Sequence, residues 1–357
     1  AASDVYKRQG VKRMASYERL QSLCEAAGVS GQEDEVREKI LAMIRPVCDT
    51  VTVTPLGGIL AEKRGQNRPK HRLMIDAHMD EVGLIITHID DEGFLSFGCV
   101  GGIDRRVLPG KRVWIGSNRV PGSVIVRPIH LTGREESGKA PSPDALVIDI
   151  GAKDRSEAMT AVQLGDTAIF DSFFEAGQGH IMGRALDDRA GCAALIHLLE
   201  QDLPYDITAS FSVQEEVGLI GAATAAFAAK PDFALVLEAT TAADIPGVAP
   251  NRQVCKVGQG PVLSFMDRST VYDPALLRFA GELAQKEAIE IQYKQAVAGG
   301  NNAGSIHRSR AGVRTLALSL ACRYLHAPMA LISEQDYAGY EKLALALAGT
   351  LPALEHI

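Results

Sequence analysis

Paired cysteine motifs are absent from this sequence. Its six cysteines are scattered over 357 residues, and no two of them have the C-x-x-C spacing. A zinc site made of thiolates or a framework of disulfides is therefore not expected. This use of cysteine is typical of a protein of the reducing cytoplasm, which is the location we predict.

Long apolar runs and an excess of positive charge are also absent. No stretch approaches the roughly 18 consecutive apolar residues of a membrane span. The 44 acidic and 37 basic residues give a formal net charge of −7. Without a basic stripe to offset the acids, nucleic acid is not expected as a partner, and neither is a membrane. Residues 1–13 have no signal-peptide pattern, and we expect a non-native or disordered extension before Met14.

Turns and apolar runs divide the chain into two kinds of segment. In residues 14–81 and 175–357, strand-like runs alternate with helical patterns, which predicts an α/β fold with a mostly parallel sheet covered by helices. In residues 82–174, short β-rich runs alternate with turns, and one helix is predicted at 155–163. We therefore expect a small β-barrel domain inserted into a discontinuous α/β domain that carries the chemistry.

Two local features of these segments can be predicted as well. Ser30 and Glu33 have the spacing of a capping box, which predicts a helix beginning at this point. The stretch 132–143 is rich in Gly, Ser, Pro and charge, which favours a mobile loop.

Two adjacent carboxylates, Glu215 and Glu216, follow the apolar strand predicted at 206–213. Open α/β sheets bind their ligands beyond the carboxyl ends of the strands. An isolated pair of acids is most often merely solvated, but further candidates occupy comparable positions. These are His78 and Asp80 after strand 72–77, Glu238 after strand 233–237, His326 after strand 315–320, and Asp187 with Asp188 before helix 188–199. The hypothesis of a site rests on this set.

The chemistry of the set indicates metal binding. Two histidines and three carboxylates without cysteine suit a pair of borderline divalent ions, zinc or cobalt, with one carboxylate bridging them. Two ions about 3.5–4 Å apart lower the pKa of a shared water and polarise a carbonyl group. The sequence therefore predicts a site for two divalent ions.

Five motifs follow one another along the chain. They are HMDEVG at 78–83, GRALDDRAG at 183–191, QEEVG at 214–218, GGNNAG at 299–304 and CRYLHAP at 322–328. In this order they resemble the motifs of the tetrahedral (TET) aminopeptidases, which include glutamyl and deblocking aminopeptidases. The resemblance runs from Met14 to the C-terminus. It implies a zinc-exopeptidase-like fold whose inserted β domain mediates oligomerisation.

The resemblance also implies a role for each site residue. Asp187 bridges two ions, His78 and Glu238 complete one site, and Glu216 and His326 complete the other. Glu215 is then the general base, and Asp80 accepts the second ring N–H of His78. Two positions depart from the family, which usually has Asp where this chain has Glu238, and Thr-Asp where it has Asn301-Asn302.

The expected activity is removal of N-terminal residues from short peptides, with Glu215 passing a proton from water to the departing amine. A metallo-deacylase of N-acyl amino acids would use the same ligands and stays open as an alternative. A non-catalytic oligomeric scaffold is a second alternative, although it would have no need of Glu215. In the resembling family, dimers assemble into a hollow tetrahedral dodecamer, so we expect a homo-oligomer. The preferred N-terminal residue and the metal used in the cell are left open by the sequence.

Overall fold

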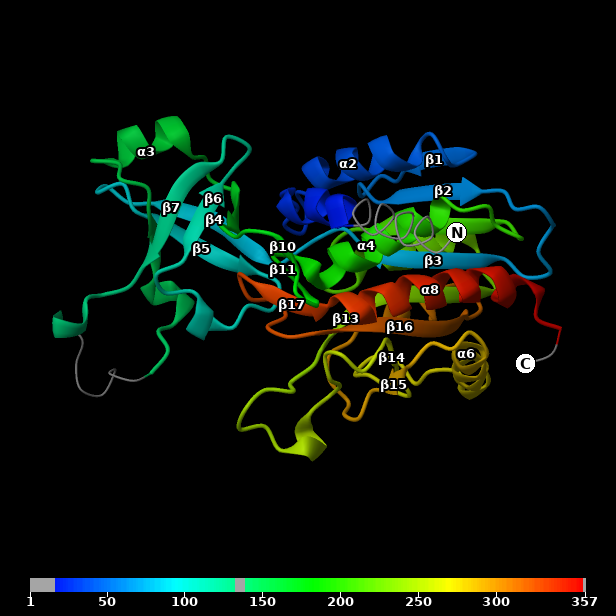
Figure 1. Cartoon of the computed structure of the whole chain (residues 1–357). Helices are drawn as coiled ribbons and strands as arrows, with labels where there is room; N and C mark the ends of the chain where they lie inside the picture. Colours follow the sequence, from blue (N-terminus) through cyan, green and yellow to red (C-terminus); the bar gives the residue numbers. More distant parts are fainter. Residues whose placement is uncertain (1–16, 132–138, 356–357) are drawn as a thin grey trace.

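The computed structural model describes residues 17–131 and 139–355, and an eight-stranded sheet is its central element (Figure 1). In spatial order the strands are β1 (Thr50–Val53), β2 (Ile59–Lys63), β12 (Ile207–Ser212), β3 (Leu73–His78), β13 (Phe233–Thr241), β16 (Arg314–Cys322), β14 (Val262–Leu263) and β15 (Gln292–Tyr293). The four central strands from β12 to β16 are parallel, while β2 and β14 join them in the antiparallel sense. The predicted α/β fold with a mostly parallel sheet is confirmed.

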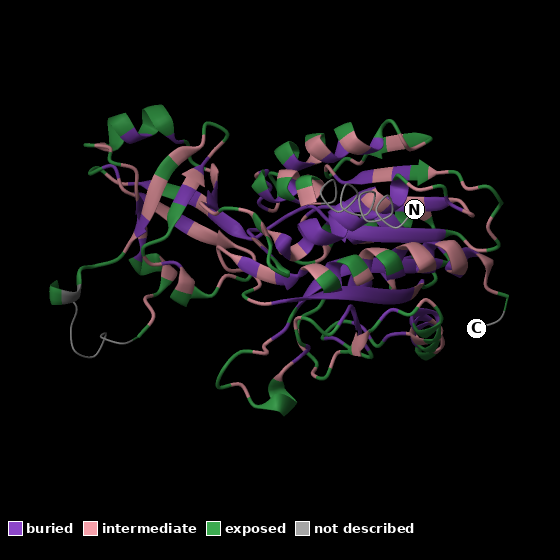
Figure 2. Cartoon of the chain, viewed as in Figure 1, coloured by how far each residue is buried: buried purple, intermediate pink, exposed green. Residues whose placement is uncertain are grey.

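Helices cover both faces of this sheet. One face carries α2 (Asp34–Ile44), α4 (Leu186–Leu199), α6 (Pro274–Lys286) and α8 (Glu334–Thr350), and the other carries α5 (Ile220–Ala229) and α7 (Ala303–Ile306). Because both faces are covered, β3 is buried along its whole length and β13 is buried up to its last residue (Figure 2). The helix α5 packs closely because it consists mostly of small residues. A Cβ at Gly221 would lie 2.4 Å from the backbone oxygen of Val213.

A closed barrel lies beside the sheet, at the left of Figure 1. Around the barrel its strands are β4 (Gly83–Ile89), β5 (Leu95–Val100), β8 (Val147–Asp149), β7 (Val120–Ile125), β6 (Arg112–Ile115) and β9 (Thr167–Phe170). The predicted helix at 155–163 is present as α3 (Arg155–Ala161). The barrel has a hydrophobic core of its own, which is separate from the main core. The predicted barrel is therefore present, whereas the loop predicted at 132–143 lies partly outside the described residues.

A three-stranded antiparallel sheet lies between the barrel and the large sheet (Figure 1). It consists of β10 (Glu175–Gly177), β11 (His180–Gly183) and β17 (Ala330–Ser333). The strand β11 leads directly into the segment before α4. Short 3₁₀ helices occur at η1 (Arg105–Val107), η2 (Ile129–Leu131), η3 (Pro143–Ala145), η4 (Pro250–Arg252) and η5 (Leu351–Ala353).

The capping box predicted at Ser30 and Glu33 is wrong. The helix α2 begins at Asp34, and no side chain caps its N-terminus. Ser30 Oγ instead donates to Asp80 Oδ2 at 2.6 Å. Glu33 Oε1 accepts hydrogen bonds from the backbone N–H groups of Gly31 and Gln214, at 2.7 and 3.2 Å. Both side chains therefore form hydrogen bonds with groups other than the first N–H groups of α2.

Two further expectations can be compared with the structure. All six cysteines are free, as their spacing predicted. Among the described residues, no helix combines the length and the apolar character that crossing a membrane requires.

Candidate metal centre

The seven predicted site residues lie together at the carboxyl edge of the parallel strands. His78 is the last residue of β3, Glu216 follows β12, and His326 follows β16. The placement of Glu238 after its strand is wrong, because β13 continues to Thr241 and Glu238 lies within it. Its side chain is nevertheless buried against His78, with Oε1 3.5 Å from Nε2.

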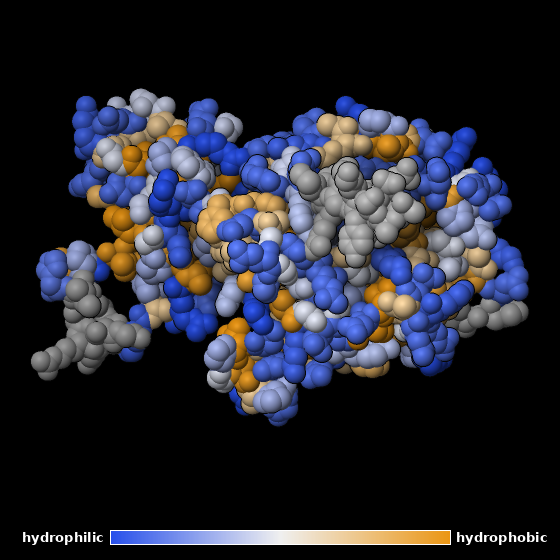
Figure 3. Space-filling model, viewed as in Figure 1, coloured by the Kyte–Doolittle hydropathy of each residue, from blue (hydrophilic) through white to orange (hydrophobic). Residues whose placement is uncertain are grey.

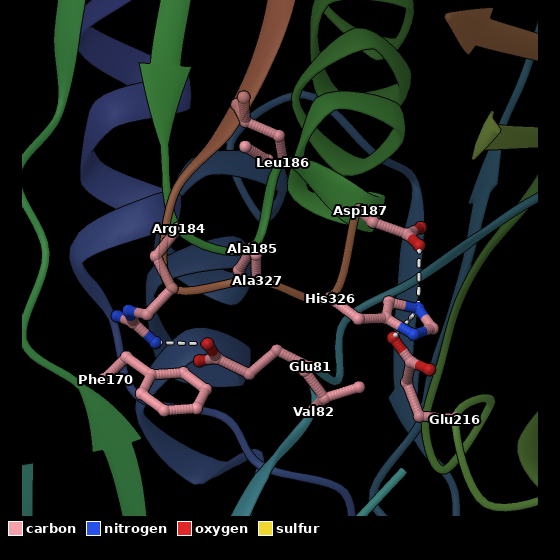
Figure 4. A pocket seen from close by; sticks show the side chains of 11 residues that line it. Glu81, Val82, Phe170, Arg184, Ala185, Leu186, Asp187, Glu216, His326 and Ala327 are labelled. Carbon is pink, nitrogen blue, oxygen red and sulfur yellow. Dashed lines mark hydrogen bonds and ion pairs between the residues drawn. The ribbon is translucent and has the colours of Figure 1, made fainter. Parts of the chain in front are cut away.

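The Asp187 carboxylate lies between the two histidines. Its Oδ1 is 3.3 Å from His78 Nε2, and its Oδ2 is 3.3 Å from His326 Nε2. Glu216 Oε1 lies 3.1 Å from the same Nε2 atom. Figure 4 shows this end of the site, with the His326 ring held between the carboxylates of Asp187 and Glu216. Asp187 is thus in contact with both imidazoles.

The backbone before α4 turns Asp187 toward the histidines. Ala185 has a left-handed conformation with φ of 55°, and Asp187 and Asp188, joined by a cis peptide bond, have non-helical angles. Asp188 is buried beside Asp187, and its Oδ1 accepts the backbone N–H of Gly191 at 3.0 Å. A Cβ at position 191 would lie 2.4 Å from that carboxylate, so only glycine leaves room for it.

Asp188 is a possible ligand to which the sequence assigned no role. Atoms able to bind a metal lie within 4.8 Å of one another in two groups, His78–Asp187–Glu216 and His78–Asp188–Glu238. The second group differs from the predicted set because it contains Asp188 in place of Asp187. Asp187 contacts both imidazoles at 3.3 Å, whereas Asp188 Oδ1 accepts a backbone N–H.

Asp80 connects one histidine to the loop that carries the glutamates. His78 Nδ1 lies 3.1 Å from the Asp80 backbone oxygen and 3.4 Å from its Oδ1, so carbonyl and carboxylate both face this ring nitrogen. Asp80 Oδ1 accepts the N–H of Glu215 at 2.9 Å, and Oδ2 accepts the N–H of Glu216 at 3.1 Å. Ser30, in the N-terminal segment, donates a further hydrogen bond to the Asp80 carboxylate. Ser30 was not predicted as a site residue, because its spacing to Glu33 matched a capping box.

Burial and mutual repulsion raise the pKa of the glutamates that are clustered at the site. Desolvation, and then the charges of Glu216 and Asp187, raise the pKa of Glu215 to about 8, against the opposing charge of His78. Burial and the charge of Asp187 likewise raise the pKa of Glu238 well above its ordinary value. For His326, burial acts to lower the pKa, but hydrogen bonds to Asp187 and Glu216 raise it to about 11. A cluster of this kind is stabilised by added positive charge.

The donor atoms fit divalent metal ions. Imidazole nitrogens and carboxylate oxygens without thiolates are the donor set preferred by borderline ions. In addition, Glu238 Oε2 and Asp188 Oδ2 are buried without a hydrogen-bond partner. A buried carboxylate oxygen without a partner is costly, and a bound cation would remove that cost.

We refer to His78, Asp187, Glu216, Glu238 and His326 as the metal-binding cluster. All of these residues except His78 line a cavity of about 460 Å³. Glu215 also lines this cavity, as do Lys294 and the glycines 299 and 300. A much smaller cavity of about 20 Å³ lies behind Asp187 and is drawn in Figure 4. There, Arg184 pairs with Glu81 in the protein interior.

The Asn302 side chain explains one of the two departures from the expected motif. Its Nδ2 donates to Asp76 Oδ2 and to Ser212 Oγ, both at 2.8 Å. Asp76 is fully buried beneath the site. An aspartate at position 302 would bring two buried carboxylates together, whereas an amide supplies a donor.

A parallel α/β sheet with an imidazole–carboxylate cluster at its carboxyl edge, and an additional glutamate beside that cluster, defines a metal-dependent hydrolase. The family model of the M42 glutamyl aminopeptidases matches residues 57–343. The chain therefore belongs to the M42 peptidase family, and it is a metal-dependent aminopeptidase. This confirms the family and the activity that the five motifs predicted.

Relatives and solved structures agree with this assignment. Lysyl aminopeptidase of Pyrococcus furiosus is 32% identical over 355 residues, which cover 96% of this chain and 99% of the relative. A TET aminopeptidase from a marine sediment archaeon of the Thaumarchaeota superposes with a TM-score of 0.90 at 35% identity, covering 94% of this chain and 96% of its own. The TET1 peptidase of Pyrococcus horikoshii, described as assembling into a tetrahedron or a large octahedral shell, has a TM-score of 0.83 at 34% identity, covering 94% and 99%. The predicted zinc-exopeptidase-like fold is confirmed.

Proposed function

We propose that this aminopeptidase uses two divalent ions and removes N-terminal residues from short peptides. The observation that carries the proposal is the Asp187 carboxylate, which contacts both imidazoles through different oxygens. Asp187 would be shared by both ions. His78 and Glu238 would complete one set of ligands, and Glu216 and His326 would complete the other. Zinc or cobalt suits this donor set best.

When bound, such ions supply Lewis acidity that polarises the scissile carbonyl and acidifies a water molecule. Glu215 acts as the general base in this proposal. Its backbone N–H is fixed by Asp80 Oδ1, and its side chain lines the cavity. It takes a proton from the attacking water and delivers it to the departing amine, a contribution of roughly 10²–10⁴-fold in rate. Asp80 is a positioning residue, because it holds His78 and the glutamate loop in one arrangement.

The family assignment favours an aminopeptidase over a deacylase. A free α-amino group offers a nitrogen that a bound ion could take as a further ligand, whereas the amide nitrogen of an N-acyl substrate is a poor ligand. The alternative of a metallo-deacylase of N-acyl amino acids therefore has less support.

A substrate panel tests the proposed function. Purified protein supplied with zinc or cobalt is assayed on peptides with free N-termini, and on the same peptides after N-acetylation. We expect cleavage of the free peptides and little or none of the acetylated ones. Preferential cleavage of the acetylated set would establish the deacylase instead.

The barrel is the surface through which we propose self-association. Val126, Leu131, Met159 and Leu164 on the inserted segment are large, apolar and exposed, and hydrophobic side chains are visible over the barrel at the left of Figure 3. Exposed apolar residues at this density are typical of contact surfaces. The assembly described for the TET1 peptidase supports a closed particle, for which we propose a dodecamer built from dimers.

Such a particle would admit short peptides and exclude folded proteins. Light scattering should give a mass close to twelve times the 38.2 kDa of the chain. A monomeric mass at micromolar concentration, or efficient trimming of a folded protein with a buried N-terminus, would contradict the proposal.

A further inference from the structure

Lys294 lines the same cavity as the metal-binding cluster and carries a positive charge there. It directly follows β15, and its backbone N–H donates to Leu263 O at 2.9 Å, which fixes its position at the edge of the large sheet. Among the described residues that line this cavity, Lys294 is the one lysine or arginine. The cavity is therefore lined both by carboxylates of the metal-binding cluster and by the positively charged Lys294.

The ammonium group of Lys294 has no acidic partner. Nζ donates to the backbone oxygen of Ala298 at 2.6 Å, and no carboxylate of the part of the chain that the structure describes lies within 4.0 Å of it. An ammonium carries three N–H donors, so two are left for other partners. Burial lowers the pKa of Lys294, against the raising effect of Asp267 and Glu238. A half-buried cation without a counter-ion is stabilised when a ligand supplies an anion.

Asp267 and Glu238, the two acids whose charges raise the pKa of Lys294, have other partners. The Asp267 carboxylate accepts the N–H groups of Ser269 and Thr270 and the hydroxyl of Tyr272. Glu238 faces His78 in the metal-binding cluster. Neither group forms an ion pair with Lys294 within 4.0 Å, so the charge of Lys294 remains available to a ligand in the cavity.

Family membership leaves the charge of the preferred N-terminal residue open. The family model is named for glutamyl aminopeptidases, whereas the Pyrococcus furiosus relative is a lysyl aminopeptidase, and these names correspond to opposite charges. We infer that Lys294 selects substrates whose N-terminal residue carries a carboxylate side chain, aspartate or glutamate. This inference rests on the proposed aminopeptidase function. The ammonium group forms a charge-assisted hydrogen bond with that carboxylate and repels lysine or arginine at the same place.

A short peptide also brings a carboxylate at its C-terminus, and anilide substrates separate the two sources. The α-p-nitroanilides of glutamate, glutamine, leucine and lysine have no C-terminal carboxylate. We expect the metal-loaded enzyme to have a kcat/KM for glutamyl anilide roughly tenfold or more above that for glutaminyl anilide, as a charge-assisted hydrogen bond provides. Lysyl anilide should be the poorest of the four.

Substitutions at position 294 test the residue itself. Lys294→Met should bring the glutamyl and glutaminyl anilides to similar kcat/KM, and Lys294→Arg should keep most of the preference. Lys256→Met is the matched control, since Lys256 is exposed outside the cavity. Free glutamate should inhibit the wild type competitively and Lys294→Met weakly, a binding readout that needs no acidic substrate.

The outcomes separate this inference from the function on which it rests. Hydrolysis of leucyl anilide together with equal glutamyl and glutaminyl rates in the wild type would overturn the role of Lys294 and leave the aminopeptidase intact. An unchanged preference for glutamyl anilide in Lys294→Met would do the same. A preference for glutamate that appears only in peptides with a free C-terminus would assign Lys294 to the C-terminal carboxylate. Failure to hydrolyse any aminoacyl substrate would contradict the proposed function itself.

Discussion

Ser30 Oγ donates a hydrogen bond of 2.6 Å to Asp80 Oδ2, which links the N-terminal segment to the centre of the site. Asp80 Oδ2 also accepts the N–H of Glu216, and Asp80 Oδ1 accepts the N–H of Glu215. The carboxylate is fully buried. Because three donors and the His78 ring surround it, Asp80 has little freedom to rotate, and Ser30 shares Oδ2 with the N–H of Glu216.

Removing this hydroxyl should weaken catalysis without unfolding the protein. Ser30→Ala leaves one Asp80 oxygen with one donor fewer, at a cost of about 1–3 kcal/mol. We expect kcat to fall by roughly tenfold or more and metal affinity to fall with it, as is common when an outer partner of a ligand is lost. Ser30→Thr keeps the hydroxyl and should keep most of the activity. If Ser30→Ala matches the wild type in kcat and in metal affinity, Ser30 has no positioning role.

Glu215 and its neighbouring ligands should respond differently to substitution. Glu215→Gln removes the base but keeps shape and hydrogen bonding, so we expect bound metal at the wild-type level and turnover reduced by roughly 10²–10⁴-fold. His78→Ala or Asp187→Ala removes a ligand and should lower the number of bound ions. The measurements are metal content after gel filtration and kcat on the same samples. Fewer ions in Glu215→Gln than in the wild type would show that the two glutamate roles are wrongly assigned.

Asp273 provides a stability test away from the site. Its carboxylate caps α6 by accepting the N–H groups of Ala275 and Leu276, and it pairs with Arg314 Nε at 2.5 Å. Asp273→Ala should destabilise the protein by about 1–2 kcal/mol. Asp273→Asn retains a capping side chain and loses only the ion pair, for which we expect less than about 1 kcal/mol. Thermal unfolding midpoints of the two variants measure the difference.

The pH dependence of this pair follows from the lowered pKa of Asp273. The hydrogen bond from Arg314 is the main cause of the lowering. A group whose folded-state pKa is lowered contributes stability above its unfolded-state pKa, about 3.9 for aspartate, and loses that contribution as the pH falls through the folded-state value. The gap between wild type and Asp273→Asn should therefore be full at pH 7 and shrink below about pH 4. A gap that widens in acid would exclude this explanation.

Much of the fold could be predicted because its elements have strong local patterns. The barrel strands β4, β6 and β9 lie within the β-rich segment predicted at 82–174. The edge of the sheet that carries the site was also predictable, since the carboxyl ends of parallel strands share one side. Glu238 shows where this reasoning fails. A charged residue after an apolar run usually marks the end of a buried strand. The Glu238 side chain instead faces the site, and β13 continues to Thr241 beside β16.

The supporting residues could not be predicted, because their partners are distant in sequence. Ser30 and Asp80 are 50 positions apart, and Asn302 and Asp76 are 226 apart. No periodicity or spacing encodes such contacts. Asp188 was a candidate without an assigned role, because its neighbour Asp187 has the same chemistry and the sequence does not reveal the non-helical backbone angles at these two residues.

Metal dependence tests the central claim most directly. The protein is dialysed against a chelator until elemental analysis finds no bound ion, assayed on a peptide with a free N-terminus, and then titrated with zinc or cobalt. The account predicts loss of activity in the metal-free protein and recovery that saturates near two ions per chain. Unchanged turnover in protein shown to be free of metal would contradict it.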